Sequence, residues 1–257
     1  MRALKRRFSF PMKDIQSIHI QHSRVVTNGH GNCNIASATV LTLENHCSYT
    51  VWPGTLSSNG GVLGNGGFAL PAGAAVQLNA PSSWSGRIWA RTGCSFDGSG
   101  NGKCVTGDCA GGLRCTGSGV PPATLAEFTI GYIGDVDFYD VSLVDGYNVG
   151  MSVRATDIEC PSAGCAADLN TGCPAELQVR DGEGAVVACK SACAAFNTAE
   201  FCCTDGFSTP RTCSPSRYSE YFKNACPTAF SYAYDDSSTC ICFDSGYIIT
   251  FCPKDLN

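Results

Sequence analysis

Cysteine is the residue that most constrains the fold of this chain, because it accounts for 18 of the 257 residues. Sixteen of the cysteines form one ordered series from Cys47 to Cys252. Such a density indicates a framework of disulfide bonds made in an oxidising compartment, and it excludes most cytosolic functions. We therefore expect a secreted protein that is held together by covalent bridges more than by a large apolar core.

The charged residues divide the chain near residue 38. Residues 1–38 hold six of the 17 Lys and Arg and one of the 22 Asp and Glu, so the remainder holds 11 basic and 21 acidic residues, a net charge of −10. An acidic body argues against nucleic acid as a partner, since phosphate binding needs clustered Lys and Arg. We interpret residues 1–38 as an atypical or truncated signal that lacks its apolar run, and we expect them to be disordered or absent from the mature, extracellular protein.

Histidine is scarce, which limits the chemistry that the acidic part can perform. Its only histidine is His46, so a Ser–His–Asp triad, a Cys–His pair or a His-based zinc site would have to use that residue. His46 adjoins Cys47 at the end of an expected strand, where a structural role is the simpler interpretation. No metal-loop spacing occurs, so we expect neither a metal nor a cofactor. No run of eighteen apolar residues occurs, so we expect no membrane span.

Short β-rich segments separated by glycine-rich turns predict a β-sandwich. The expected strands are residues 39–45, 48–52, 86–91, 125–130, 137–143 and 247–251, with Pro53–Gly54 ending the second. Residues 92–122 carry four cysteines among many glycines, and residues 167–226 carry seven cysteines and the only helical pattern, which begins at an N-cap at Ser214 before Pro215. We therefore divide the chain into a sandwich (39–91, 123–166 and 227–257), a small disulfide lobe (92–122) and a helical disulfide lobe (167–226).

Seven short segments together resemble the thaumatin-like family of pathogenesis-related plant proteins, to which osmotin-like and zeamatin-like proteins belong. The longest is Gly100–Cys115, and the others are Cys47–Gly54, Ile88–Cys94, Thr124–Phe128, Asp145–Asn148, Cys165–Leu169 and Thr250–Pro253. The resemblance covers residues 39–257. It implies a mainly β fold: a thaumatin-like β-sandwich with a disulfide-rich helical lobe and a small disulfide-rich loop lobe.

The resemblance also implies one disulfide pairing among the roughly two million that sixteen cysteines allow. The implied pairs are Cys47–Cys252, Cys94–Cys104, Cys109–Cys115, Cys160–Cys242, Cys165–Cys226, Cys173–Cys189, Cys193–Cys202 and Cys203–Cys213. Two cysteines stand outside this pattern. Cys33 belongs to the leader, and Cys240 lies where relatives usually carry an apolar residue, so we interpret Cys240 as a buried free thiol that packs as a small hydrophobe.

In this family an acidic cleft lies between the sandwich and the helical lobe. The resemblance places one arginine and four carboxylates of this chain there, namely Arg87, Glu127, Asp140, Asp145 and Asp235. Asp236 adjoins Asp235, so either of the two could be the cleft residue.

Three functions are compatible with these residues. In the first, a monomeric antifungal protein is secreted into the apoplast and binds the β-1,3-glucan of fungal walls. It does so through its carboxylates and through the aromatic candidates Phe128, Tyr132, Phe138 and Tyr139, each of which is more often a core residue. In the second, it is a weak endo-β-1,3-glucanase with Glu127 as general acid and Asp140 or Asp145 as base or nucleophile.

The third function dispenses with sugar recognition: the protein inhibits foreign hydrolases or perturbs membranes. A purely structural interpretation also exists, in which Arg87 pairs with a carboxylate within a solvated ion cluster.

Overall fold

A computed structural model of the protein describes residues 38–131 and 136–256, together with all side chains of these residues except that of Asp236. The expectations for the leader, for Cys33 and for Tyr132 therefore lie outside the described residues. Within the described ranges, no helix is long and apolar enough to cross a membrane.

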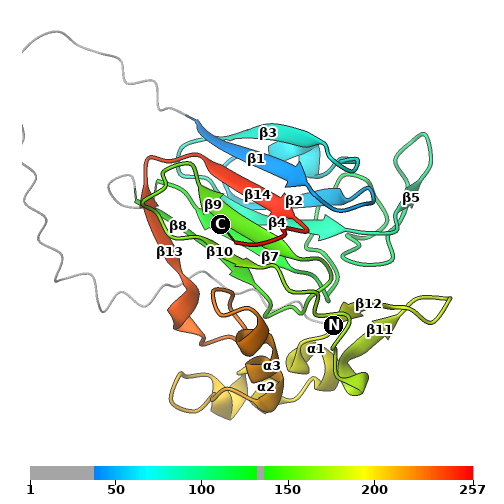
Figure 1. Ribbon diagram of the computed structural model, residues 1–257, viewed down its shortest axis with the longest axis vertical. Helices are drawn as coiled ribbons and strands as arrows, with labels where there is room; N and C mark the ends of the chain where they lie inside the picture. The colour runs from blue at the N-terminus through cyan, green and yellow to red at the C-terminus, as the bar shows by residue number, and fades with distance from the viewer. Residues whose placement is uncertain (1–37, 132–135, 257) are drawn as a thin grey trace, which may run out of the picture. The chain divides into compact units, whose positions relative to one another are not determined.

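Two five-stranded sheets form a sandwich, as the sequence predicts (Figure 1). The first sheet has the order β10-β9-β14-β1-β3, from strands β1 (Thr39–Asn45), β3 (Ala75–Ala80), β9 (Met151–Ala155), β10 (Ala163–Cys165) and β14 (Tyr247–Phe251). The second has the order β13-β8-β7-β4-β2, from β2 (Trp52–Asn59), β4 (Ser85–Arg91), β7 (Leu125–Thr129), β8 (Val136–Ser142) and β13 (Cys240–Phe243). Strands β1 and β14 pair in parallel, and the other pairs within these two sheets are antiparallel.

The core between the sheets is aromatic at its centre. The rings of Phe128 and Tyr139 lie 5.3 Å and 4.9 Å from that of Tyr247. The Tyr247 hydroxyl donates a hydrogen bond of 2.7 Å to Asp137, and the amide of Gly131 donates another of 2.7 Å to the same carboxylate. A buried carboxylate is tolerated here because both of its oxygens are hydrogen-bonded.

Two local predictions were wrong in their bounds. Strand β2 begins at Trp52 and continues through Pro53 and Gly54 instead of ending there. Proline is acceptable because β2 is an edge strand, where a missing N–H can face away from the neighbouring strand. Helix α3 (Arg217–Ala225) is capped at Ser216 and not at Ser214, because Ser216 and Ser219 form a reciprocal capping box.

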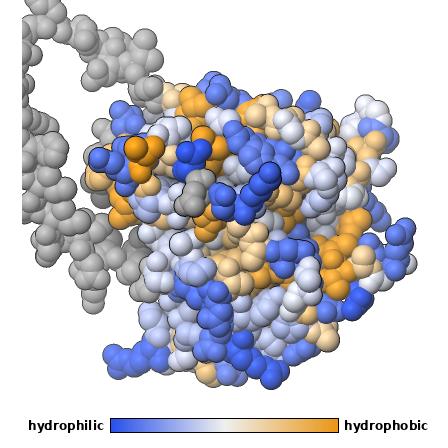
Figure 2. Space-filling model, in the orientation of Figure 1, coloured by the Kyte–Doolittle hydropathy of each residue, from blue (hydrophilic) through white to orange (hydrophobic). Residues whose placement is uncertain are grey.

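The remaining elements are short. They are helices α1 (Ala192–Phe196) and α2 (Ala199–Cys202), 3-10 turns η2 (Leu63–Gly66), η3 (Ala175–Leu177), η4 (Asp205–Phe207) and η5 (Asp236–Ser238), and the two-stranded pairs β5 (Ser95–Phe96) with β6 (Gly102–Lys103) and β11 (Gln178–Arg180) with β12 (Val186–Cys189). The part of the molecule that holds the helices shows a mostly hydrophilic surface in Figure 2. The division of the chain into a sandwich and two lobes stays a prediction.

Eight disulfide bonds cross-link the described residues, and they join the same eight pairs that the family resemblance implies. They are Cys47–Cys252, Cys94–Cys104, Cys109–Cys115, Cys160–Cys242, Cys165–Cys226, Cys173–Cys189, Cys193–Cys202 and Cys203–Cys213. Cys240 is free and buried. Five of the eight bridges close loops of 6 to 16 residues, which stabilises segments that have little apolar core of their own.

A fully buried arginine fastens the glycine-rich loop of residues 92–122 to the second sheet. The guanidinium of Arg91 donates hydrogen bonds to the carbonyls of Trp52 (2.9 Å), Gly112 (2.8 Å) and Leu113 (2.7 Å). Burial lowers the pKa of Arg91 to about 10, although the charge of Asp108 opposes this shift. The charge is retained at neutral pH, and the loop carbonyls provide its solvation.

Candidate functional site

Arg87, Glu127 and Asp140 form a row across three neighbouring strands of the second sheet. Strand β4 places Arg87 directly opposite Glu127 of β7, and β7 places Glu127 directly opposite Asp140 of β8. Residues opposite one another in an antiparallel pair have Cα atoms about 4.5–5.5 Å apart. The alternating neighbours Ile88, Ala126 and Tyr139 belong to the core, so the row lies on the outer face of the sheet.

Glu127 is the carboxyl group of the row that forms an ion pair with Arg87. The Nη2 atom of Arg87 lies 3.7 Å from Oε1 of Glu127, and the two side chains are 22% and 16% exposed. A nearby cation at this degree of burial favours the ionised carboxylate.

Asp140 lies in a different environment on the other side of Glu127. The residue as a whole is half-buried, but its Oδ1 atom is inaccessible to solvent and has no hydrogen-bond partner among the described residues. Burial raises the pKa of Asp140 well above its ordinary value; the charge of Glu127 raises it further, and Arg87 opposes both effects. The two carboxyl groups therefore lie in unequal environments: a guanidinium lies beside Glu127, whereas burial and the charge of Glu127 favour the protonated form of Asp140.

Asp145 lies outside this row. It occupies the turn after β8, where its backbone carbonyl accepts a hydrogen bond of 3.2 Å from the amide of Ala123. Its membership of the site stays a prediction.

Asp235 is only 6% exposed and its carboxylate is extensively hydrogen-bonded. Lys223 Nζ lies 3.0 Å from Oδ2, the amide of Ser231 donates a bond of 2.9 Å, and the hydroxyl of Ser237 donates one of 2.8 Å. Burial alone would raise the pKa of Asp235, but these hydrogen bonds, led by that from Lys223, outweigh it and hold the pKa below its ordinary value. This geometry indicates a structural ion pair, and the side chain of the neighbouring Asp236 is not described.

Of the described aromatic candidates, two lie in the core and one lies on the outer face of the sheet. Phe128 and Tyr139 are 2% and 1% exposed, so they belong to the core and were wrong as stacking surfaces. Phe138 is half-buried and lies two residues from Asp140 on the same face of β8. It is therefore the one described aromatic candidate that shares a face with the row.

Sequence reasoning missed two apolar side chains on this face. Ile241 and Phe243 of β13 are 46% and 59% exposed. The signal was available: Cys242 is bonded to Cys160 and Cys240 is buried, so strand alternation turns the residues between and beyond them outward.

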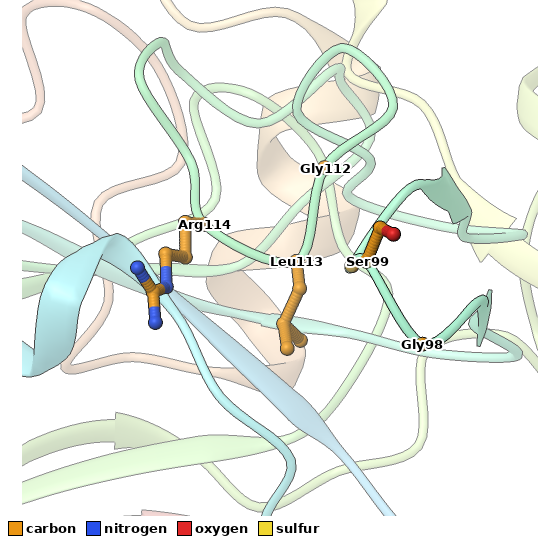
Figure 3. Close-up of a pocket in the computed structure, with 6 residues that line it drawn as sticks. Gly98, Ser99, Gly112, Leu113 and Arg114 are labelled. Carbon is orange, nitrogen blue, oxygen red and sulfur yellow. The ribbon is translucent and has the colours of Figure 1, made fainter.

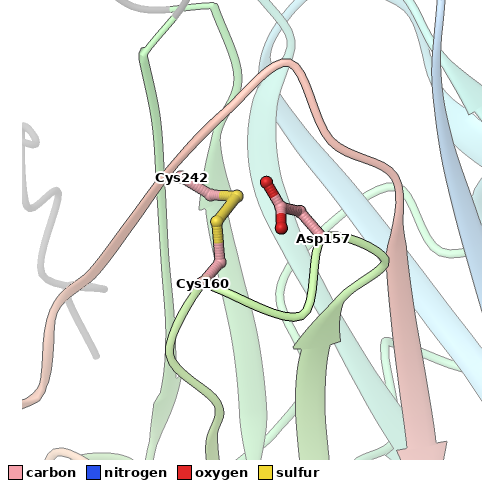
Figure 4. A group of neighbouring side chains, drawn as sticks. All are labelled: Asp157, Cys160 and Cys242. Atoms are coloured by element: carbon pink, nitrogen blue, oxygen red, sulfur yellow. A yellow bond between two sulfur atoms is a disulfide. The ribbon is translucent and has the colours of Figure 1, made fainter.

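Two other clusters of side chains are not sites of the same kind. Asp157 lies beside Cys160 and Cys242 (Figure 4), but both sulfur atoms belong to one disulfide and the Asp157 carboxylate accepts the amide of Glu159 at 3.0 Å. A disulfide offers no thiolate, so this group is unsuited to a metal. A shallow hollow near Arg114 (Figure 3) is lined by Gly98, Ser99, Gly100, Gly112, Leu113 and Arg114, and contains no carboxylate.

Residues 45–253 match the thaumatin family. The chain belongs to the thaumatin family. It is 60% identical over 229 residues to the pathogenesis-related thaumatin-like protein 3.5 of Cryptomeria japonica, a match that covers 87% of this chain and 93% of that protein. It is 52% identical over 225 residues to a protein of Prunus avium named glucan endo-1,3-beta-glucosidase, covering 85% of this chain and 92% of that one.

Among solved structures, the fold resembles that of a laminaripentaose-producing β-1,3-glucanase of glycoside hydrolase family 64 from Paenibacillus barengoltzii. The TM-score is 0.56 at 14% identity, with 84% of this chain and 75% of that chain covered. At this identity the likeness concerns the fold alone. The thaumatin-family assignment rests on the family match and on the close relatives.

Proposed function

We propose that this thaumatin-family protein is a secreted, antifungal plant defence protein that binds β-1,3-glucan at the Arg87–Glu127–Asp140 row. The observation that carries the proposal is the row itself, in which strand register aligns two carboxyl groups and a guanidinium on the outer face of the sheet. All three side chains are partly exposed on one face of the sheet, so they can contact a ligand that lies across strands β4, β7 and β8.

The row offers what a polyhydroxylated ligand needs. An ionised Glu127 accepts hydrogen bonds, a protonated Asp140 donates one, and Arg87 donates several. Sugar hydroxyls both donate and accept, and they carry no charge that an acidic protein would repel. The relative named glucan endo-1,3-beta-glucosidase supports a β-1,3-glucan as the polysaccharide.

Defence and secretion are supported by different observations. The relative from Cryptomeria japonica is named a pathogenesis-related protein. Eight disulfide bonds in one chain require an oxidising compartment, which is the extracellular route in plants as in other organisms.

Retention on insoluble β-1,3-glucan tests the binding site. We expect the wild-type protein to be pulled down and the Glu127→Ala, Asp140→Ala double variant to be retained much less. A matched control removes two exposed carboxylates elsewhere, Glu183→Ala with Glu220→Ala, and leaves retention unchanged. Equal retention of the site variant and wild type would reject the row as the binding site.

A second candidate function, weak hydrolysis of the same glucan, is favoured by the unequal carboxyl pair. A glycosidase needs one protonated and one ionised carboxyl group, and the row supplies both. For this activity we assign the roles in the opposite order to that expected from sequence: Asp140, whose pKa is raised by burial, is the proton donor, and Glu127, which pairs with Arg87, is the base or nucleophile.

Release of reducing ends from laminarin measures this activity. Asp140→Asn should abolish it, because an amide has no acidic proton to give to the leaving group. Activity that survives in Asp140→Asn and disappears in Glu127→Gln would return the acid role to Glu127. If the wild-type protein releases no reducing ends but is retained on the insoluble glucan, the protein binds without hydrolysis.

A further inference from the structure

Strand β13 brings two exposed apolar side chains onto the face that carries the proposed glucan site. Ile241 lies opposite Phe138 of β8, and Phe243 lies opposite Val136. Phe138 and Val136 alternate with core residues along β8 and so share the outer face with Asp140. A second row, one pleat step from Asp140, therefore runs across the sheet through Ser85, Thr129, Phe138 and Ile241, from polar to apolar.

The platform formed by Phe138, Ile241 and Phe243 is held rigidly. Strand β13 is an edge strand (Figure 1), and edge strands are usually less constrained than central ones. Here Cys242 is bonded to Cys160, and Cys240 is 7% exposed in the core. These two inward anchors fix which face the alternate residues occupy, so Ile241 and Phe243 cannot turn inward without breaking a covalent bond.

Two neighbouring apolar side chains that are exposed to water are energetically unfavourable unless a ligand covers them. Phe243 is 59% exposed and Ile241 is 46% exposed, side by side on one short strand. Single exposed apolar residues are ordinary, whereas neighbouring ones beside a group of polar side chains are typical of binding surfaces.

We propose that Ile241 and Phe243, with Phe138, form an apolar platform on which sugar rings of a β-1,3-glucan stack beside the Arg87–Glu127–Asp140 row. This inference rests on the proposed function and extends it to a named subsite. A pyranose ring has apolar C–H faces and a hydroxylated edge. The strands supply a partner for each: apolar side chains on β8 and β13, and hydrogen-bonding groups from Asp140 to Arg87.

The surroundings favour a sugar over the other occupants of an apolar patch. Asp140 and the exposed Asp244 border it, and no lysine or arginine occurs between Val136 and Ser142 or between Cys240 and Tyr247, which disfavours an anionic lipid surface. The patch also consists of few side chains on a four-residue strand, whereas a stable dimer buries roughly 1,200–2,000 Å².

Calorimetric titration of the full chain with laminarihexaose tests the platform. The variants are Ile241→Thr, Phe243→Leu, Phe243→Trp and the double variant Ile241→Thr, Phe243→Ser. We expect the double variant to bind about three- to tenfold more weakly, which is the range for losing one or two ring contacts. Phe243→Leu keeps an apolar side chain but removes the flat ring, so it should also weaken binding, whereas Phe243→Trp should bind at least as tightly as wild type.

Two further measurements complete the design. Val62→Thr and Val105→Thr remove exposed apolar groups from other loops and should leave affinity unchanged. In Phe243→Trp, the new indole should shift its fluorescence emission to shorter wavelength when laminarihexaose is added, because the sugar removes water from the ring.

The possible results separate the platform from the site on which it rests. If wild type binds laminarihexaose and the double variant binds equally well, the platform is wrong and the proposed function stands. If wild type does not bind, both are wrong. Concentration-dependent dimerisation of wild type that the double variant loses would assign this strand to a protein interface and would also overturn the platform.

Discussion

Asp140 lies directly opposite Glu127, in adjacent strands of the second sheet. Like charges in that position are destabilising. The structure relieves this repulsion unequally, because Glu127 faces Arg87 whereas the Oδ1 atom of Asp140 is buried without a partner. Most of the chemistry that we assign to this protein follows from that asymmetry.

The pair should titrate as a coupled unit. Removing the charge in Glu127→Gln should lower the pKa of Asp140, because Glu127 raises it, whereas Arg87→Gln should raise that pKa further, because Arg87 lowers it. Titration of selectively labelled carboxyl carbons by NMR measures both shifts. Shifts of the same sign in the two variants would contradict the coupling.

Protein stability should depend on Asp140 in a defined pH range. The folded protein binds this proton more tightly than the unfolded chain does, so stability falls as the pH rises from about 4, the ordinary carboxyl value, through the raised pKa of the folded state. Asp140→Asn cannot lose a proton and should be more stable than wild type at pH 7 but not at pH 3. Denaturant unfolding at the two pH values checks this, and a variant that is less stable at pH 7 would contradict it.

The ion pair of Lys223 and Asp235 should have the opposite pH dependence. Lys223→Met leaves a buried carboxylate without its cation and should reduce the free energy of unfolding by about 3 kcal/mol at pH 7. Because the pKa of Asp235 is depressed in the folded state, this loss is present above about pH 4 and disappears as acid protonates the carboxylate. Arg217→Met, which breaks an exposed pair with Glu176, is the control and should cost less. A loss in Lys223→Met that is the same at pH 2 would refute this account.

Arg91 should not be replaceable by another cation. Lysine offers a single ammonium group, so Arg91→Lys leaves carbonyls among Trp52, Gly112 and Leu113 without a donor. We expect a loss of roughly 2–4 kcal/mol in the free energy of unfolding, from one or two buried unsatisfied groups. Thermal unfolding checks the loss, and hydrogen exchange in residues 92–122 should increase before the rest of the protein unfolds.

Cys240 should be inert in the folded protein and a hazard during folding. Burial raises its pKa to about 11, with a further contribution from Asp140 and an opposing one from a hydrogen bond with Tyr139, so almost no thiolate is present at pH 8. Peptide mapping after iodoacetamide treatment should find Cys240 labelled only in unfolded protein.

During folding, Cys240 competes with Cys242 for Cys160, because the two lie on the same face of one strand. Cys240→Val should therefore increase the yield of correctly bridged protein in oxidative refolding. An unchanged yield would show that the competing bridge does not form.

Several strands could be predicted from the sequence because the patterns that specify them are local. Strands β1 and β14 follow from alternating β-branched and aromatic residues, and their bounds match those expected. The edge position of β2 is a property of the whole sheet. The sequence alone therefore predicted that the strand ends at Pro53, although it continues to Asn59. The cap of α3 depended on which of two nearby serines could bond reciprocally with Ser219, and only Ser216 does.

The candidate site was also predictable only in part. The residue types came from a family resemblance, but their grouping is set by strand register, which brings Arg87, Glu127 and Asp140 into line across 53 residues of sequence and leaves Asp145 in a turn. Register also explains why Ile241 and Phe243 were overlooked: the cysteines beside them indicate that they face outward, but only the pairing of β13 with β8 brings them near Asp140.

The cross-linked, mainly β character of this protein follows from cysteine number and strand patterning, which are local properties of the amino-acid sequence. The raised pKa of Asp140, in contrast, could not be deduced from the chain as written. The pKa of a carboxyl group depends on burial and on the distance to neighbouring charges, and these exist only after strands β4, β7 and β8 have been placed side by side.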